Sequence, residues 1–175
     1  MVDPALVQSA RNGDAGAVDA LLRALWPHAY RIAFVVLRDG AAAEDAAQDA
    51  LARVWATLGE LNEPVAFAAW FYRLVVNSAK MERRSSNRRR AREETHVPAE
   101  ERSDVDTRID ISVALGTLPE WLRLPIVLHY YAGLSSVEIG RVLGAPAATI
   151  RFRLSVARRQ LKPKLDAERP IGVAL

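Results

Sequence analysis

A helix-turn-helix pattern near the C-terminus constrains the fold of this chain more than any other feature. Ser135 and Glu138 have the spacing of a capping box, in which each side chain satisfies a backbone N–H group at the start of a helix. Gly144 can adopt the left-handed conformation that ends this helix, and Pro146 follows in the turn. The last third of the chain is therefore predicted to contain two helices joined by a tight turn.

The second of these predicted helices has one apolar face and one basic face. The apolar positions recur at helical spacing: Ile150, Leu154, Ala157 and Leu161. The opposite side carries Arg151, Phe152, Ser155 and Arg159. A basic helix held against a small core fits the major groove of DNA. An ordinary helical hairpin with a solvated basic face is the alternative interpretation, because such patterns also match by chance.

The composition disfavours several classes of function. A chain of 175 residues can form one ordinary domain or two small ones, and the lack of cysteine excludes disulfides and thiolate zinc sites. The three histidines are not at metal-ligand spacing from one another, so we expect structural roles for them and no metal or cofactor. We find no phosphate-binding loop, nucleophile elbow or paired carboxylates in an apolar setting, which argues against an enzyme.

The apolar segments argue against a membrane protein. The longest apolar runs, such as Ile32 to Leu37, are far too short to span a bilayer. The N-terminus has no basic segment followed by an apolar one, as a secretory signal would have. We therefore expect a soluble, cytoplasmic protein with no membrane insertion of its own.

Charge is distributed unevenly along the chain. Residues 1–92 carry 13 Lys and Arg against 10 Asp and Glu, residues 93–111 carry 2 against 7, and residues 112–175 carry 9 against 4. Two basic blocks thus flank an acidic stretch with too little apolar content to fold alone. This pattern indicates two nucleic-acid-facing domains joined by a flexible linker. A plain tether explains the linker residues at least as well as a sequence-specific role.

The first basic block is predicted to be all helix. A short helix starts after the cap Asp3 and ends near Gly13, and Asp14 caps a second helix. Pro27 lies inside the second helix and should kink or break it. Residues 39–40 then turn the chain. No stretch alternates with period two, so no sheet is expected.

Two further helices are predicted in this block. The third helix has an apolar face formed by Ala47, Leu51, Val54, Trp55 and Leu58. Its other face displays Glu44, Asp45, Gln48, Asp49 and Arg53. The fourth helix begins near Ala66, is first apolar and becomes basic from Lys80 onward. Its first turns contain Phe67, Trp70, Phe71, Leu74 and Val75, which we interpret as core residues more readily than as a base-stacking platform.

Four motifs occur in a fixed order: residues 43–50, residues 67–77, residues 118–135 and the helix-turn-helix. In this order and spacing the chain resembles the extracytoplasmic-function (group IV) sigma factors of bacterial RNA polymerase, over roughly residues 5–84 and 111–162. The resemblance implies an all-α fold of two small helical domains joined by a flexible linker, the C-terminal one a helix-turn-helix domain. We assign an N-terminal sigma domain to residues 1–92, an acidic linker to 93–110, a C-terminal sigma domain to 111–165 and a tail to 166–175.

The resemblance also implies a function. Such proteins are non-catalytic subunits that bind core RNA polymerase and direct promoter-specific transcription initiation. The N-terminal domain would capture the melted minus-10 element, and the C-terminal domain would bind the minus-35 duplex. The implied partners are the β′ clamp coiled coil and the β flap of core polymerase, promoter DNA and an anti-sigma factor.

Site residues follow from the same resemblance. Polymerase docking is assigned to three residues of the acidic helix face: Asp45, Gln48 and Asp49. The alternative interpretation is that this face is simply solvated. Asn77 offers both a donor and an acceptor to an extruded base, and the basic residues near it would contact the minus-10 DNA: Arg73, Lys80, Arg83 and Arg84. The minus-35 contacts are assigned to Thr149, Arg151, Phe152, Arg153, Ser155, Arg158 and Arg159.

Two points stay open at this stage. Phe152 stands where the family commonly has a small hydroxyl residue, so it either touches thymine methyl groups or packs within its own domain. A dimeric, operator-binding repressor is the alternative function. It would explain the C-terminal half but would leave the acidic helix face and the segment from Trp70 to Asn77 unused.

Overall fold

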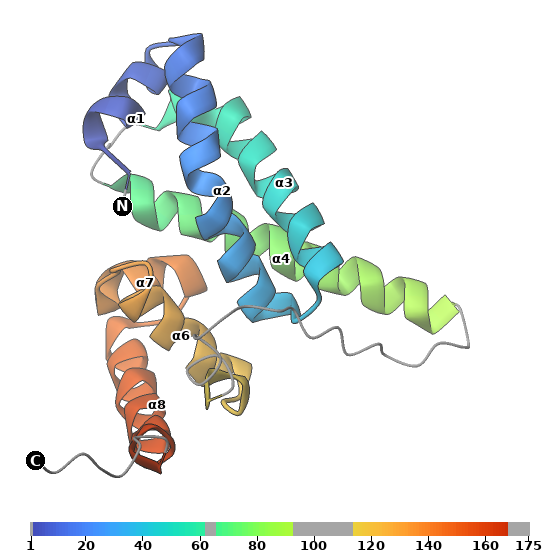
Figure 1. The fold of residues 1–175 in the computed structure, drawn as a ribbon, viewed down its shortest axis with the longest axis vertical. Helices are drawn as coiled ribbons and strands as arrows, with labels where there is room; N and C mark the ends of the chain where they lie inside the picture. Colours follow the sequence, from blue (N-terminus) through green and yellow to red (C-terminus); the bar gives the residue numbers. More distant parts are fainter. Residues whose placement is uncertain (1, 62–65, 93–113, 168–175) are drawn as a thin grey trace, which may run out of the picture.

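The computed structural model describes residues 2–61, 66–92 and 114–167, and within these ranges it consists of helices and their connections (Figure 1). The N-terminal half contains α1 (Pro4–Arg11), α2 (Ala15–Leu37), α3 (Gly40–Thr57), the short 3-10 helix η1 (Leu58–Glu60) and α4 (Phe67–Arg92). The C-terminal half contains α6 (Glu120–Tyr130), α7 (Ser136–Leu143) and α8 (Ala147–Ala167). The predicted all-α fold is confirmed. The predicted linker, residues 93–110, lies outside the described residues.

Aspartate caps determine where the first three helices begin. The carboxylate of each cap accepts a hydrogen bond from a backbone N–H group in the first turn: Asp3 from Ala5 (2.9 Å), Asp14 from Ala17 (2.8 Å) and Asp39 from Ala42 (2.9 Å). The caps at Asp3 and Asp14 were predicted. The turn predicted at residues 39–40 is displaced by one residue, because Arg38 takes the left-handed conformation (φ 56°) and α3 already starts at Gly40.

Helix α2 continues through Pro27, so of the predicted kink or break the break does not occur. Pro27 and Arg23 both lie on the exposed side of the helix, where the carbonyl group that loses its N–H partner can be hydrated. Among the described residues α2 is also the one helix long and apolar enough to cross a membrane. Its apolar face is nevertheless packed inside the protein, with Leu21 and Ile32 fully buried, as in a core helix.

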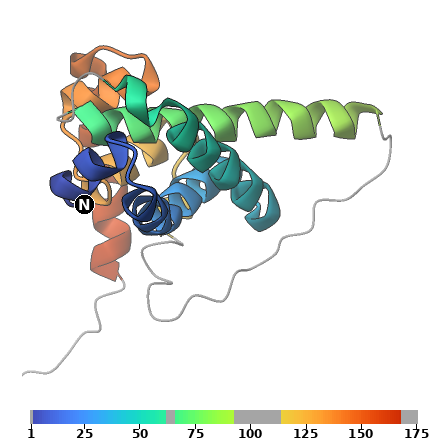
Figure 2. The ribbon, with the colours of Figure 1, turned by 90° about the horizontal axis from the view of Figure 1, so that it is seen from above.

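The N-terminal core forms where α2, α3 and α4 cross (Figures 1 and 2). Helix α3 contributes mainly small buried side chains: Ala43, Ala46, Ala47 and Ala50. These let α2 and α4 approach closely, and Phe71 and Val75 of α4 fill the space between the helices. Trp55 was predicted on the buried face, but its side chain is 69% exposed.

The C-terminal half has the predicted helix-turn-helix geometry. The Ser135 hydroxyl accepts a hydrogen bond from the Glu138 backbone N–H (3.3 Å), and the Glu138 carboxylate accepts one from the Ser135 N–H (2.8 Å). Gly144 is left-handed (φ 67°), as predicted. Gly140 permits the sharp turn, since a Cβ atom there would lie 2.5 Å from the Ala145 carbonyl oxygen.

The two halves pack against each other, which the sequence did not predict. Helix α6 contacts α2 and α7 contacts α4, so the C-terminal half lies against one side of the N-terminal bundle (Figure 1). The guanidinium group of Arg123, a 9% exposed residue, donates hydrogen bonds to the Val35 carbonyl (3.2 Å) and the Leu118 carbonyl (3.1 Å). Arg31 of α2 stacks on the ring of Tyr131, with 4.6 Å from the guanidinium carbon to the ring centroid.

Candidate nucleic-acid and protein interfaces

The acidic face of α3 divides into two parts in the structure. Asp45 and Gln48 are both exposed; Gln48 lies on the outer side of the helix, and Asp45 lies at the edge of that side, where it also lines the groove between α3 and α4. Trp55, two helical turns after Gln48, extends the same side with a large apolar surface. This outer face can therefore offer a partner both a carboxylate and an aromatic side chain, as protein interfaces often do.

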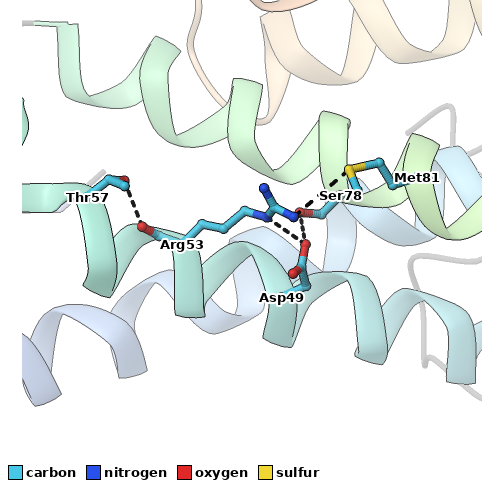
Figure 3. A network of polar contacts seen from close by, with 5 residues as sticks. All are labelled: Asp49, Arg53, Thr57, Ser78 and Met81. Atoms are coloured by element: carbon cyan, nitrogen blue, oxygen red, sulfur yellow. Dashed lines mark hydrogen bonds and ion pairs between the residues drawn. The ribbon is translucent and has the colours of Figure 1, made fainter.

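Asp49 instead faces α4 and takes part in a polar network (Figure 3). Its carboxylate accepts a hydrogen bond from the Ser78 hydroxyl (2.5 Å) and another from Arg53 Nε (2.9 Å). Ser78 is 3% exposed, so the contact fixes α3 to a buried point on α4. Asp49 thus has a structural role besides any role in docking.

The pKa of Asp49 reflects this environment. Partial burial raises the pKa, but the hydrogen bonds from Arg53 and Ser78 and the charge of Arg53 outweigh it, so the pKa is lowered overall. Asp49 therefore stays ionised at neutral pH.

Arg53 extends the network in two directions. The hydroxyl of Thr57, one turn after Arg53, donates a hydrogen bond to the Arg53 carbonyl oxygen (2.7 Å), and the Arg53 guanidinium lies 4.0 Å from the Met81 sulfur.

Helix α4 separates the predicted minus-10 residues into two groups. Arg73, Asn77 and Arg84 are exposed and recur at intervals of four and seven residues, so they form one row along the helix. Arg83 instead points to the C-terminal half, where it forms an ion pair with Glu120 of α6. Lys80 is half-buried and lines a cleft between α4 and the C-terminal helices.

The aromatic residues at the start of α4 belong to the core. Phe67 is 8% exposed and Phe71 is 2% exposed, and their rings stack with centroids 6.3 Å apart. Trp70 and Leu74 are partly buried and pack against the same cluster. The interpretation of these residues as core rather than a base-stacking platform is supported.

Helix α8 presents the face that its sequence pattern predicted. Ile150 is fully buried and Leu154 is 3% exposed. The outward residues are Arg151, Phe152, Ser155 and Arg159. Phe152 is 63% exposed, which excludes the alternative that it packs inside its own domain.

The remaining predicted minus-35 residues lie at the edges of this face. Thr149 is half-buried, and Arg153 lines the cleft that also contains Lys80 of α4. Arg158 donates a hydrogen bond to the Tyr130 hydroxyl (2.8 Å) and lies over the same ring. Arg158 is thus bound to another part of the chain and Arg153 is partly covered in the cleft, whereas Arg151 and Arg159 face solvent.

No group of three or more His, Cys, Asp or Glu residues in the described ranges could hold a metal ion. The ring of His129 contacts the Leu134 carbonyl oxygen through Nδ1 (2.8 Å). His28 lies 3.4 Å from the Tyr72 hydroxyl through its Nδ1 atom, and partial burial lowers its pKa. Both rings have the structural roles expected from their scattered positions. His96, the third histidine, lies outside the described residues.

Comparison with known proteins assigns both halves of the chain. The family model described as Sigma-70 region 2 matches residues 18–89, and the one described as Sigma-70, region 4 matches residues 108–161. The chain is 33% identical to the ECF RNA polymerase sigma factor SigL of Mycobacterium tuberculosis, over 89% of this chain and 94% of SigL. It is 31% identical to the probable RNA polymerase sigma factor RfaY of Xanthomonas campestris pv. campestris, over 77% of this chain but only 36% of that protein.

A solved structure has the same fold. The sigma factor RpoE from Bartonella quintana, in a co-crystal with the anti-sigma factor NepR, superposes with a TM-score of 0.69 and 24% sequence identity. The match covers 86% of this chain and 98% of that one.

Proposed function

Because this chain belongs to the extracytoplasmic-function sigma factors of the sigma-70 family, we propose that it reads two promoter elements, with α4 on the melted minus-10 strand and α8 in the minus-35 major groove. Sigma factors of this family are non-catalytic subunits that bind core RNA polymerase and promoter DNA and direct promoter-specific initiation. The bacterial cytoplasm is the compartment in which it would act.

One observation carries this proposal: the chain has two separate exposed basic surfaces, one on each half. The row on α4 combines two cations, Arg73 and Arg84, with the amide of Asn77. The cations attract phosphates regardless of sequence, whereas the amide can both donate to and accept from a base edge. The outward face of α8 combines Arg151 and Arg159 in the same way with side chains that can read a duplex.

Docking to core polymerase is assigned to the outer face of α3. Gln48 is exposed there and Asp45 at its edge, and a basic surface of the β′ clamp coiled coil would be attracted and oriented by the carboxylate. Asp49 lies at the edge of this face and is held by Ser78, so it would contribute its charge from a fixed position. The C-terminal half would contact the β flap.

Full promoter contact requires the two halves to separate. Lys80 and Arg153, assigned to different promoter elements, line the same cleft between the halves, and Arg83 is paired with Glu120. A DNA phosphate would have to replace the Glu120 carboxylate to engage Arg83. An anti-sigma factor, like the one bound to the Bartonella quintana relative, would keep the protein inactive by covering these surfaces.

A reversible crosslink tests the need for separation. His28 and Tyr131 come from opposite halves, their ring centroids are 5.3 Å apart, and neither is assigned to DNA contact. The chain has no cysteine, so a His28→Cys, Tyr131→Cys variant can be bridged selectively with a cleavable bis-maleimide reagent. The bridged protein should still bind core polymerase but fail to form promoter complexes, and cleavage should restore them. The same variant capped with two monofunctional maleimides is the control, and normal promoter binding by the bridged protein would disprove the opening.

A further inference from the structure

Phe152 is a large apolar residue on the outward face of α8. It lies two positions from both Ile150 and Leu154, which point into the core, so its side chain projects from the opposite side of the helix. At 63% exposure it is one of the few large apolar side chains exposed in the described part of the chain, and it is flanked by Arg151 and Ser155. Arg159, seven residues later, lies on the same side.

The chemistry of this side chain limits what it can recognise in a DNA groove. An aromatic ring without polar atoms gives no hydrogen bond to a phosphate or to the acceptors of guanine and adenine. The apolar group that the major groove displays is the 5-methyl group of thymine. Contact with that methyl group would remove apolar surface of both partners from water.

We propose that Phe152 makes minus-35 recognition depend on the 5-methyl group of a thymine, so that a T·A pair is preferred opposite this residue. The inference rests on the proposed function, in which α8 enters the major groove. Arg151 and Arg159 hold the helix against the duplex through phosphates or base edges. Phe152 then selects one base pair by an apolar contact rather than by a hydrogen bond.

Replacing thymine with uracil isolates this contact. The substitution deletes one methyl group and leaves the pairing and every hydrogen-bonding group of the base pair in place. Promoter duplexes are first selected by the wild-type holoenzyme from a library with a randomised minus-35 element. Each thymine of the selected element, on either strand, is then replaced singly by uracil, and holoenzyme binding is measured.

Wild-type holoenzyme should lose about three- to fivefold in affinity at one or two uracil positions, the usual effect of removing one buried methyl group. The Phe152→Ala holoenzyme should bind the thymine promoter more weakly and should no longer distinguish thymine from uracil there. Phe152→Leu should keep part of the discrimination. The matched control is Arg159→Ala, which should weaken binding to thymine and uracil promoters alike.

Three results would overturn the inference: a selected minus-35 element without thymine, no loss at any uracil position, or full discrimination retained by Phe152→Ala. In each case the proposed function would stand as long as the holoenzyme still requires its minus-35 element. A holoenzyme that ignores scrambling of the whole element would refute the minus-35 assignment itself. The two failures are therefore distinguishable.

Discussion

Replacing Ser78 by alanine removes a hydrogen bond between α3 and α4 and should lower the free energy of unfolding. The structure sets the size of this loss. The Ser78 hydroxyl donates to an ionised carboxylate, and such hydrogen bonds contribute about 1.5–3 kcal/mol. The Asp49 side chain is 48% exposed and keeps its bond to Arg53, so water can replace part of the lost contact and the low end of that range applies. Alanine regains roughly 0.5 kcal/mol in helix propensity. The expected net loss is about 1 kcal/mol of unfolding free energy.

The loss should also depend on pH. The folded-state pKa of Asp49 is lowered, so its contribution to stability is fully present above the ordinary carboxyl pKa of about 3.9 and is lost as the pH falls through the lowered value. Urea denaturation followed by circular dichroism should therefore show wild-type and Ser78→Ala proteins furthest apart near pH 7. The difference should shrink toward pH 3.

Ser86→Ala is the matched control on the same helix. The Ser86 hydroxyl makes only long contacts, 3.4 Å to Glu82 and 3.5 Å to Arg89, so its removal should change stability by less than about 0.5 kcal/mol. A Ser78→Ala protein as stable as Ser86→Ala, or a stability difference that stays constant between pH 7 and pH 3, would refute the proposed energetics of this network.

Three further substitutions test the proposed interfaces, and a fourth, in the core, serves as a comparison. Asp45→Lys should weaken binding to core polymerase without lowering thermal stability. Fluorescence anisotropy at several salt concentrations measures this binding. Unchanged affinity and salt dependence would remove Asp45 from the docking surface. Asn77→Ala should change preference at one unpaired minus-10 base by about 1–3 kcal/mol in open-complex assays, whereas an equal loss on every minus-10 variant would exclude base reading. Arg151→Ala should reduce binding of the holoenzyme to the minus-35 element in gel-shift assays, at unchanged stability of the protein. Leu154→Ala should instead lose roughly 2–5 kcal/mol of unfolding free energy through an unfilled core site. An unstable Arg151→Ala protein with normal promoter selection would mean that α8 faces the other way.

Local sequence signals predicted the elements of the fold well. Capping residues such as Asp14 and Ser135 act within a few residues of their own positions, so their effects can be predicted without knowing the tertiary structure. Periodicity likewise placed Leu154 inward and Phe152 outward on α8. The pattern did not settle whether Phe152 packs within its own domain, because helical spacing does not show whether another element of that domain covers an outward residue.

Tertiary contacts account for the predictions that were wrong or missing. Trp55 looks like a core residue by spacing, but the alanines of α3 already fill the contact with α2 and α4 and leave the indole outside. Asp49 was predicted to be part of an open acidic face, since nothing local indicates that Ser78 lies opposite it. Arg123 is a charged residue that is buried because its guanidinium group donates to the carbonyl oxygens of Leu118 and Val35, 5 and 88 positions away. Nothing in the local sequence indicates the contact with Val35.

Reconstituted transcription tests the promoter-reading function most directly. Purified core RNA polymerase should produce run-off transcripts from a selected promoter only when this protein is added, and scrambling either the minus-35 or the minus-10 element should abolish them. The protein alone should bind the same duplex poorly. Tight binding of the duplex by the protein without core polymerase, together with no transcript when core is present, would contradict a sigma function and favour a repressor.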